Sequence, residues 1–293
     1  MQISSSPQQL QSKPREVLCI DAVDWILGSD APLAGSIFTG IPDIKDIPLF
    51  NNMKNSTALQ RTEDYLSWST ALLDGLFRRL AIGQVAIFNV TDAKVMTASG
   101  DIVCWVDKSH LCSLSASKHQ CNLLWHKIAI NSDHQDSCSP YRPSYTHLLC
   151  YGKQMEYKLS QFRTPDVFDR GAMSWAKAIG LDACIMGVAF LRDVVGTPVV
   201  IDPFCGHGTI LAVANYFGLP SLGIEICVRR ARQALARNVS SIISQLSATR
   251  LKQLGIVSAD NGAYDEDKCM GEVCTNDDQD EDPNELVSQE ATL

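Results

Sequence analysis

The sequence lacks an apolar run long enough to span a bilayer, because each run is shorter than the ~18–20 residues that a membrane-spanning helix needs. It also lacks a C-x-x-C pair, its 11 cysteines are an odd number, and no apolar segment follows the polar start MQISSSPQQLQSKPRE. These absences disfavour a membrane span, a secretory signal and a disulfide framework. We therefore expect reduced thiols in an intracellular protein, cytoplasmic or nuclear.

The net charge of −8 is unevenly distributed. Residues 260–293 hold twelve acids and one base and carry −11, whereas residues 1–259 hold 24 bases against 21 acids and carry +3. We interpret 260–293 as an acidic disordered tail, because it cannot bury enough apolar surface to order itself. The weakly basic remainder is compatible with a polyanionic partner but does not demand one.

Three segments are expected: a disordered N-terminus at 1–16, one domain at 17–259 and the tail at 260–293. Short apolar runs alternate with helical patterns inside the domain. The expected strands lie at 17–20, 35–39, 84–90, 123–130, 145–151, 197–202 and 220–226, and the expected helices at 22–27, 65–80, 171–178, 182–194, 210–218 and 228–246. This alternation predicts an α/β domain with a mainly parallel, doubly wound sheet, in which 123–130 and 145–151 form an antiparallel pair.

The strongest local signal lies in residues 199–225. A strand ends at Asp202, a loop with Gly206 and Gly208 leads into a helix, and the next strand ends in Glu225. Glycines let the backbone approach a ligand, the helix N-terminus offers free N–H groups to an anion, and the second acid can accept hydrogen bonds from ribose hydroxyls. The pattern predicts a site for a nucleoside-bearing cofactor, and a tight structural turn is the alternative.

The stretches VIDPFCGHGT and GIE resemble motifs I and II of the S-adenosylmethionine-dependent methyltransferases, in the D-P-F-x-G-x-G-T form of exocyclic-amine methyltransferases that act on DNA and RNA. The chain also resembles their circularly permuted arrangement, in which the catalytic half precedes the cofactor loop. TGIPD and Trp105–Lys108 (WVDK) resemble uncharacterised eukaryotic RNA methyltransferases. The resemblance covers nearly all of residues 17–240. It implies a Rossmann-like, seven-stranded methyltransferase sheet, mostly parallel with an antiparallel terminal hairpin.

The resemblance also implies roles for single residues. Asp202 and the loop amides would hold the methionine part of S-adenosyl-L-methionine, Glu225 would hold its ribose, and Asp21 would reach its adenine. The full set of expected cofactor-binding residues is Asp202, Pro203, Phe204, Gly206, Gly208, Thr209, Glu225, Asp21 and Thr39.

Thr39–Asp43 (TGIPD) takes the place of the T-S-P-P-Y catalytic motif of that family. There, a polar side chain and a backbone carbonyl accept hydrogen bonds from the target amine, and the terminal aromatic stacks on the base; this chain has Gly40 and Asp43 at those positions. We expect Ile41, Pro42 and Asp43 to be catalytic, with an amine or amide nitrogen bonded to a main-chain carbonyl and to Asp43, which takes or orients the departing proton. A turn role for Asp43 is the alternative.

The expected function is therefore methyl transfer from S-adenosyl-L-methionine, with RNA as the preferred partner. A catalytically inactive RNA-binding or scaffold subunit is the alternative, and a dinucleotide dehydrogenase is disfavoured because the loop lacks a third glycine. Histidines and cysteines crowd residues 104–150, but their spacings match no paired-ligand pattern, so no metal is expected. The arginines of 228–246 are interpreted as a solvated face, and His207 as a packing residue beside the cofactor.

Overall fold

The computed structural model describes residues 15–47, 50, 57–97, 99–132, 143–154, 156–175 and 177–256. Strand β1 (Arg15–Leu18) begins two residues before the predicted start of the domain. The rest of the predicted N-terminal segment and the whole acidic tail lie outside the described residues, so their disorder stays a prediction. Within the described residues, no helix combines the length and the apolar character needed to cross a membrane.

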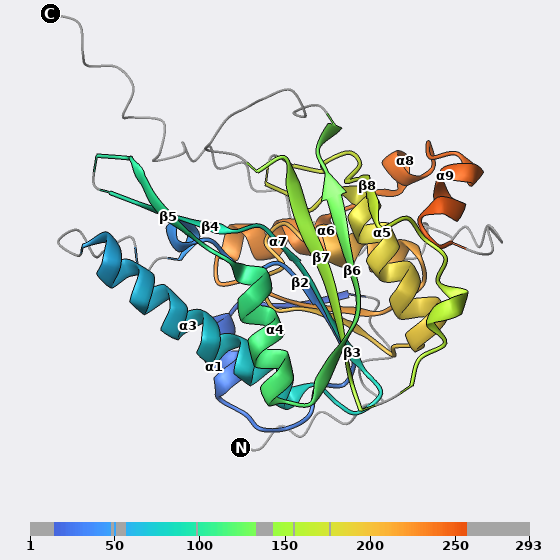
Figure 1. Cartoon of the computed structure of the whole chain (residues 1–293). Helices are drawn as coiled ribbons and strands as arrows, with labels where there is room; N and C mark the ends of the chain where they lie inside the picture. The colour runs from blue at the N-terminus through green and yellow to red at the C-terminus, as the bar shows by residue number, and fades with distance from the viewer. Residues whose placement is uncertain are drawn as a thin grey trace, which may run out of the picture. The chain divides into compact units, whose positions relative to one another are not determined.

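The main sheet has eight strands in the order β1-β10-β9-β2-β3-β7-β6-β8 (Figure 1). Besides β1, its strands are β2 (Ser36–Thr39), β3 (Val85–Val90), β6 (Cys121–Ile130), β7 (Tyr145–Lys153), β8 (Val167–Asp169), β9 (Val200–Asp202) and β10 (Ser221–Ile224). Among these strands only β7 runs against its neighbours, β3 and β6. The prediction of a mostly parallel α/β sheet with an antiparallel β6–β7 hairpin is confirmed.

The predicted count of seven strands is wrong, because β8 adds an eighth strand parallel to β6. This strand has three residues, of which only Phe168 is buried. Such a short segment shows no alternation of apolar and polar residues from which a strand can be predicted.

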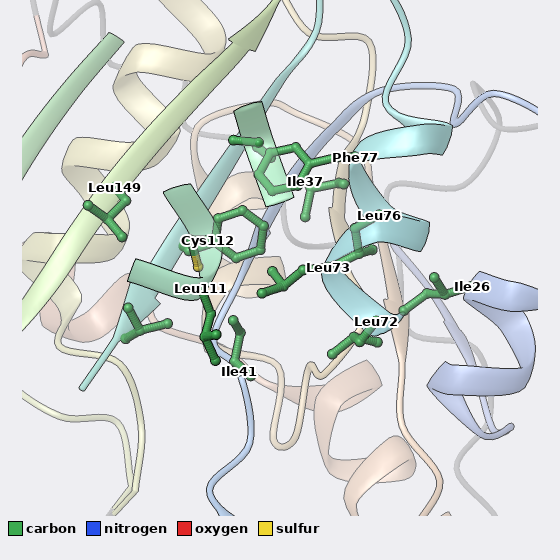
Figure 2. Packing of buried hydrophobic residues seen from close by; sticks show 14 of the residues in the cluster. Ile26, Ile37, Ile41, Leu72, Leu73, Leu76, Phe77, Leu111, Cys112 and Leu149 are labelled. Carbon is green, nitrogen blue, oxygen red and sulfur yellow. The ribbon is translucent and has the colours of Figure 1, made fainter. Parts of the chain in front are cut away.

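Helices cover both faces of the sheet because side chains of each strand alternate between the faces. Ile37 of β2 packs with one buried cluster and the next residue, Phe38, packs with the other. The first cluster includes residues of α1 (Ala22–Leu27), α3 (Ala58–Arg79) and α4 (Lys108–Lys118), several of which are shown in Figure 2. The second includes residues of α5 (Leu181–Phe190), α6 (Thr209–Tyr216) and α8 (Ser240–Ile243), and the partly buried Leu251 of α9 (Ala248–Gln253) packs against it. The doubly wound arrangement is therefore confirmed.

Helix α3 starts seven residues earlier than predicted, at Ala58. The side chain of Thr57 accepts a hydrogen bond from the Gln60 amide at 3.1 Å, which caps the first turn although that turn carries no apolar stripe. Farther along, Gly75 allows α3 to approach α1 closely, since a Cβ at this position would lie 2.6 Å from Cγ2 of Ile26.

The predicted helix at 171–178 is wrong. Its described residues form a loop that begins at Gly171, whose φ of +77° lies in the left-handed region. A Cβ there would lie 2.5 Å from the Asp182 carboxylate, so the chain passes too close to the start of α5 for a larger residue. This loop places Ser174 and Trp175 beside the candidate site described below.

The predicted helix at 228–246 is also wrong as a continuous element. Helix α7 ends at Ala236 (Val228–Ala236), because Arg237 adopts an extended backbone with ψ of 124°. The Asn238 side chain then accepts a hydrogen bond from the Ser240 amide at 2.7 Å, and the short helix α8 follows. Asn competes with helical hydrogen bonds in this way, which explains the break.

A hairpin and a helix that the sequence did not predict lie between β3 and β6. Strands β4 (Ala93–Met96) and β5 (Ile102–Val106) form a separate antiparallel pair, and α4 follows them directly (Figure 1). The Asp107 side chain caps α4 by accepting from the His110 amide at 2.9 Å. Lys108 is thereby fixed as the first residue of the helix.

Candidate active site

The glycine loop lies between β9 and α6, at the carboxyl end of the parallel strands. Gly206 and Gly208 have φ of +53° and +78°, a conformation that favours glycine. A Cβ on Gly208 would also lie 2.8 Å from Cα of Ala234 in α7. Gly208 is the N-cap of α6 and makes no side-chain capping bond, so the first N–H groups of α6 have no side-chain cap. A loop of this kind can receive an anionic group such as a carboxylate.

Pro203, Phe204 and Thr209, the other predicted residues of the loop, make contacts that hold its shape. Pro203 is buried, and the Phe204 amide donates to Oδ1 of Asp202 at 3.1 Å, which turns the chain at the end of β9. The Phe204 ring packs against Trp68 of α3 with ring centroids 6.4 Å apart. Thr209 is buried at the start of α6, and its hydroxyl shares a 2.7 Å hydrogen bond with that of Ser174.

Asp202 is a buried acid that joins the loop to strand β2. Thr39, the last residue of β2, donates its hydroxyl hydrogen to Oδ1 of Asp202 at 2.6 Å. Burial raises the pKa of Asp202 to about 7, and the nearby charge of Glu225 adds to the rise, while the bonds from Thr39 and Phe204 oppose it. Among the described residues no cation pairs with this carboxylate. A ligand that carries positive charge would complete the site.

Glu225 follows β10 and is buried beside the loop, with 7% of its surface exposed. Its Oε1 accepts from the Cys227 amide at 2.8 Å and from Nε of Arg230 at 2.9 Å. These two bonds fix the orientation of the Glu225 carboxylate. The glycine loop is also bonded to β10, because the Cys205 amide donates to the Ile224 carbonyl at 3.1 Å.

Asp21 follows β1, which is the neighbour of β10 in the sheet. Its Oδ1 accepts from the Val23 amide at 2.7 Å and from the Asp24 amide at 3.4 Å, so Asp21 caps α1. The half-buried side chain thus has a structural role, and its predicted contact with adenine stays a prediction.

The TGIPD segment leaves β2 next to the glycine loop, and its polar groups are already bonded within the protein. The Ile41 carbonyl accepts from Nζ of Lys108 at 2.9 Å, and the Pro42 carbonyl accepts from the Tyr65 hydroxyl at 2.8 Å. Oδ1 of Asp43 forms a 2.5 Å ion pair with the same Lys108 ammonium. The catalytic roles expected of Ile41, Pro42 and Asp43 stay predictions.

Lys108 is the principal residue that the sequence interpretation missed. The WVDK stretch resembles a family motif, but its spacing does not show that Lys108 reaches Asp43, 65 residues earlier. A lysine is rarely buried unless it is paired, and the sequence does not identify Asp43 as its partner.

The prediction that the arginines of 228–246 form one solvated face is wrong. Arg229 and Arg232 are exposed, whereas Arg230 pairs with Glu225 and Nε of Arg237 donates to the His207 carbonyl at 3.1 Å. His207 is a packing residue in the structure, since its ring stacks on Trp175 with centroids 4.1 Å apart.

The histidine and cysteine region contributes a pair, not a cluster. Nε2 of His126 and Nδ1 of His147 lie 2.9 Å apart across β6 and β7. His134 and Cys138 lie outside the described residues. In the described part of the chain, no three His, Cys, Asp or Glu side chains are grouped as metal ligands would be.

Two solved structures of similar fold have descriptions that name methylation of DNA. A Thermus thermophilus protein provisionally assigned as a DNA modification methylase, in complex with S-adenosyl-L-methionine, is 18% identical, with a TM-score of 0.57 over 80% of this chain and 96% of that chain. The cytosine-N4-specific PvuII DNA methyltransferase is 11% identical, with a TM-score of 0.54 over 82% of this chain and 91% of that chain. This chain has the fold of a methyltransferase. Neither a protein-family model nor a curated protein matches the sequence.

Proposed function

We propose that this protein is an S-adenosyl-L-methionine-dependent methyltransferase that acts on a base nitrogen of RNA. The observation that carries the proposal is the 2.6 Å hydrogen bond from Thr39 to Asp202. It joins the segment expected to face an acceptor to the loop expected to face a cofactor, across the neighbouring strands β2 and β9. A transferase needs its two ligand sites to meet in this way, because the reacting atoms must lie in line and close together.

The residues present fit the proposed cofactor. S-adenosyl-L-methionine supplies an activated methyl group on a sulfonium, and it carries an ammonium, a carboxylate and a ribose. The buried Asp202 carboxylate lacks a cation among the described residues, which suits the positively charged methionine part. The amides at the start of α6 suit its carboxylate, and Glu225 suits the ribose hydroxyls. Asp21 is assigned to the adenine side.

The strand order supports the permuted arrangement. β9 and β10 follow all the other strands of the sheet in the sequence, yet in the sheet they lie between β1 and β2. Asp21, Glu225 and Asp202 therefore follow three adjacent parallel strands, and TGIPD follows the fourth. Ligands of open α/β sheets bind at the carboxyl ends of such strands.

RNA is preferred over DNA because TGIPD and WVDK are similar to eukaryotic RNA methyltransferases. The net charge of +3 on residues 1–259 is compatible with either nucleic acid. The similar solved structures are DNA methyltransferases, so DNA is the substrate against which the proposal must be tested.

The test has a binding step and a transfer step. Calorimetry with S-adenosylhomocysteine and with NAD first separates a methyltransferase from a dehydrogenase. Tritiated methyl transfer is then measured on total RNA and on duplex and single-stranded DNA of matched length. We expect binding of S-adenosylhomocysteine and incorporation into RNA. Incorporation into DNA alone would contradict the RNA assignment, and binding of NAD in place of S-adenosylhomocysteine would contradict the methyltransferase assignment.

A non-catalytic RNA-binding subunit is the second candidate. The observation in its favour is that the Ile41 and Pro42 carbonyls and the Asp43 carboxylate are bonded to Lys108 and Tyr65. Binding of S-adenosylhomocysteine without transfer to any nucleic acid would support this candidate.

A further inference from the structure

Lys108 places a buried ammonium group against the TGIPD segment. Its side chain is 3% exposed, and Nζ donates to the Ile41 carbonyl at 2.9 Å and to Oδ1 of Asp43 at 2.5 Å. The Pro42 carbonyl is occupied separately by the Tyr65 hydroxyl at 2.8 Å. The Ile41 and Pro42 carbonyls and Oδ1 of Asp43 thus accept hydrogen bonds from side chains of the protein itself.

The fold holds Lys108 in this position. The Asp107 cap starts α4 at Lys108, and Leu111, three residues later, belongs to the same hydrophobic cluster as Ile41 (Figure 2). Helix α4 is therefore held against TGIPD both by apolar packing and by the ion pair between Lys108 and Asp43. Lys108 does not have the freedom of a lysine on the surface, where rotamers are many and ion pairs are weak.

This arrangement disfavours an exocyclic amine as the acceptor. Such an amine has a lone pair delocalised into the ring, and hydrogen bonds from its N–H groups to protein acceptors help to localise that pair. Here the amine would compete with Lys108 for the Ile41 carbonyl and the Asp43 carboxylate. Displacement would leave a buried ammonium without partners, which is strongly unfavourable.

A pyridine-type ring nitrogen has no such requirement. Its lone pair lies in the plane of the base and is available without an N–H acceptor. Methylation leaves the base with a positive charge, and a carboxylate nearby stabilises that charge. Asp43 is suited to this role, because Lys108 holds its carboxylate in place while 27% of the side chain stays exposed.

We propose that Lys108 is a specificity-determining residue that directs transfer to a ring nitrogen of a nucleobase rather than to an exocyclic amine; this inference rests on the proposed function. The lone pair of the ring nitrogen forms the new N–CH3 bond as the S–CH3 bond breaks, and the electron pair of that bond returns to sulfur. No proton leaves, and the positive charge passes from the sulfonium to the methylated base.

The first test measures the hold of Lys108 on the segment without any cofactor. Amide hydrogen exchange over residues 39–47 is compared in the wild type, Lys108→Met, Lys108→Arg and Lys118→Met. Lys118 is the matched control, because it lies on the same helix and its 3.4 Å ion pair with Asp74 is exposed. We expect exchange about tenfold faster in Lys108→Met, a smaller change in Lys108→Arg and none in Lys118→Met. Unchanged exchange in Lys108→Met would overturn the positioning role.

The second test identifies the product. RNA methylated by the wild-type protein is digested at neutral pH, because alkali converts 1-methyladenosine to its amine-methylated isomer. The nucleosides are then separated against isomer pairs of equal mass, such as 3-methylcytidine with N4-methylcytidine and 1-methyladenosine with N6-methyladenosine. We expect only ring-methylated nucleosides, and their yield should fall about 100-fold in Lys108→Met while the affinity for S-adenosylhomocysteine stays unchanged. An amine-methylated product would overturn this inference and keep the proposed function, whereas no methylated nucleoside of either class would overturn both.

Discussion

Two acids of the candidate site, Asp202 and Asp43, have opposite surroundings. Asp202, on the expected cofactor side, is buried with hydrogen-bond donors but, in the described part of the chain, without a cation, and the first turn of α6 has no side-chain cap. Asp43, on the expected acceptor side, is paired with Lys108, and the carbonyls of Ile41 and Pro42 accept from Lys108 and Tyr65. Asp202 therefore leaves a charge for a ligand to pair, whereas Asp43 already has its partner in the protein.

This difference separates binding from positioning. A buried group without its partner destabilises the free protein, and a ligand that supplies the partner recovers that free energy on binding. A self-satisfied group gains less from a ligand but is held at a fixed position before the ligand arrives. We therefore expect cofactor-side substitutions to change affinity and acceptor-side substitutions to change rate, which the predictions below test from the largest effect to the smallest.

The largest effect is expected from Gly206→Val, which should abolish cofactor binding. Gly206 has φ of +53°, and among the described residues a Cβ there would have only Trp175 nearby, at 3.6 Å. The substitution therefore meets no clash with this part of the chain, but it strains the backbone and adds a side chain to the loop that a ligand would contact. Calorimetry with S-adenosylhomocysteine measures the loss.

Gly196→Val is the matched control for this substitution. Gly196 also has a positive φ, +66°, and in the described part of the chain no atom beyond its own neighbours in the sequence lies within 4 Å of an added Cβ. It should lose about as much stability through strain, roughly 1–2 kcal/mol, and keep its cofactor affinity. Equal affinity losses in both variants would show that the effect comes from general destabilisation.

Asp43→Ala should lower the transfer rate about 100-fold and leave cofactor affinity within a few-fold. The substitution removes the partner of the buried Lys108 ammonium, so the acceptor segment loses its position. Asp43→Asn keeps an acceptor oxygen for Lys108 and should retain the rate within about tenfold, because the proposed step releases no proton. Single-turnover transfer at saturating cofactor measures both. An Asn variant as slow as the Ala variant would show that the rate depends on the charge of the Asp43 carboxylate or on its taking a proton, and not on its hold on Lys108 alone.

Asp202→Asn should stabilise the protein at pH 8 by ~2 kcal/mol while weakening cofactor binding. The folded-state pKa of about 7 lies above the ordinary 3.8, so between these values the folded state holds a proton that the unfolded state has released. Stability of the wild type relative to the Asn variant therefore falls as pH rises from about 4 to about 7 and stays constant above. Thermal unfolding across this range should give a melting temperature roughly 4–8 °C higher for the variant at pH 8.

Asp182→Asn is the contrasting control. Asp182 is also buried, and burial raises the pKa of its carboxyl as well, but the carboxylate pairs with Arg250 at 2.5 Å. Asp182→Asn should therefore stabilise the protein at pH 8 less than Asp202→Asn does, because Arg250 loses its partner. If both Asn variants raised stability by the same amount, the unpaired state of Asp202 would not explain its behaviour.

The parts of the fold that the sequence predicted are those with strong local signals. The short apolar runs of β2, β3 and β9 are bounded by turn residues. Gly206 and Gly208 indicated a loop, and both have the positive φ that glycine favours. The parts that failed depend on distant partners. The loop that begins at Gly171 is fixed by its close approach to α5, which no local pattern contains. After Ala236, the local cap from Asn238 to the Ser240 amide acts together with the distant contact from Arg237 to the His207 carbonyl.

The candidate site shows the same division. Asp202 and Glu225 were singled out because each ends a predicted strand, and Thr39 because TGIPD resembles the catalytic motif of a family. The structure brings Thr39 and Asp202 together at one edge of the sheet, where parallel strands place their carboxyl ends. The role of Lys108 was not found, because α4 has few apolar residues and its position depends on the unpredicted β4–β5 hairpin. Motif spacing was therefore enough to predict which residues lie together on the expected cofactor side. The contacts of the expected acceptor side could be seen only in the three-dimensional structure.

The smallest effect is expected from deletion of residues 260–293, which tests the charge of the substrate. Removing the −11 tail changes the net charge from −8 to +3. RNA should then bind a few-fold more tightly at low salt, because repulsion of its phosphates weakens, and the gain should shrink near 0.15 M salt, where the screening length is ≈ 8 Å. Cofactor affinity should not change. Fluorescence anisotropy with labelled RNA at several salt concentrations measures the effect, and a full-length variant with the tail acids changed to Asn and Gln separates charge from length. A gain in the truncated protein but not in the neutralised one would show that charge is not the cause.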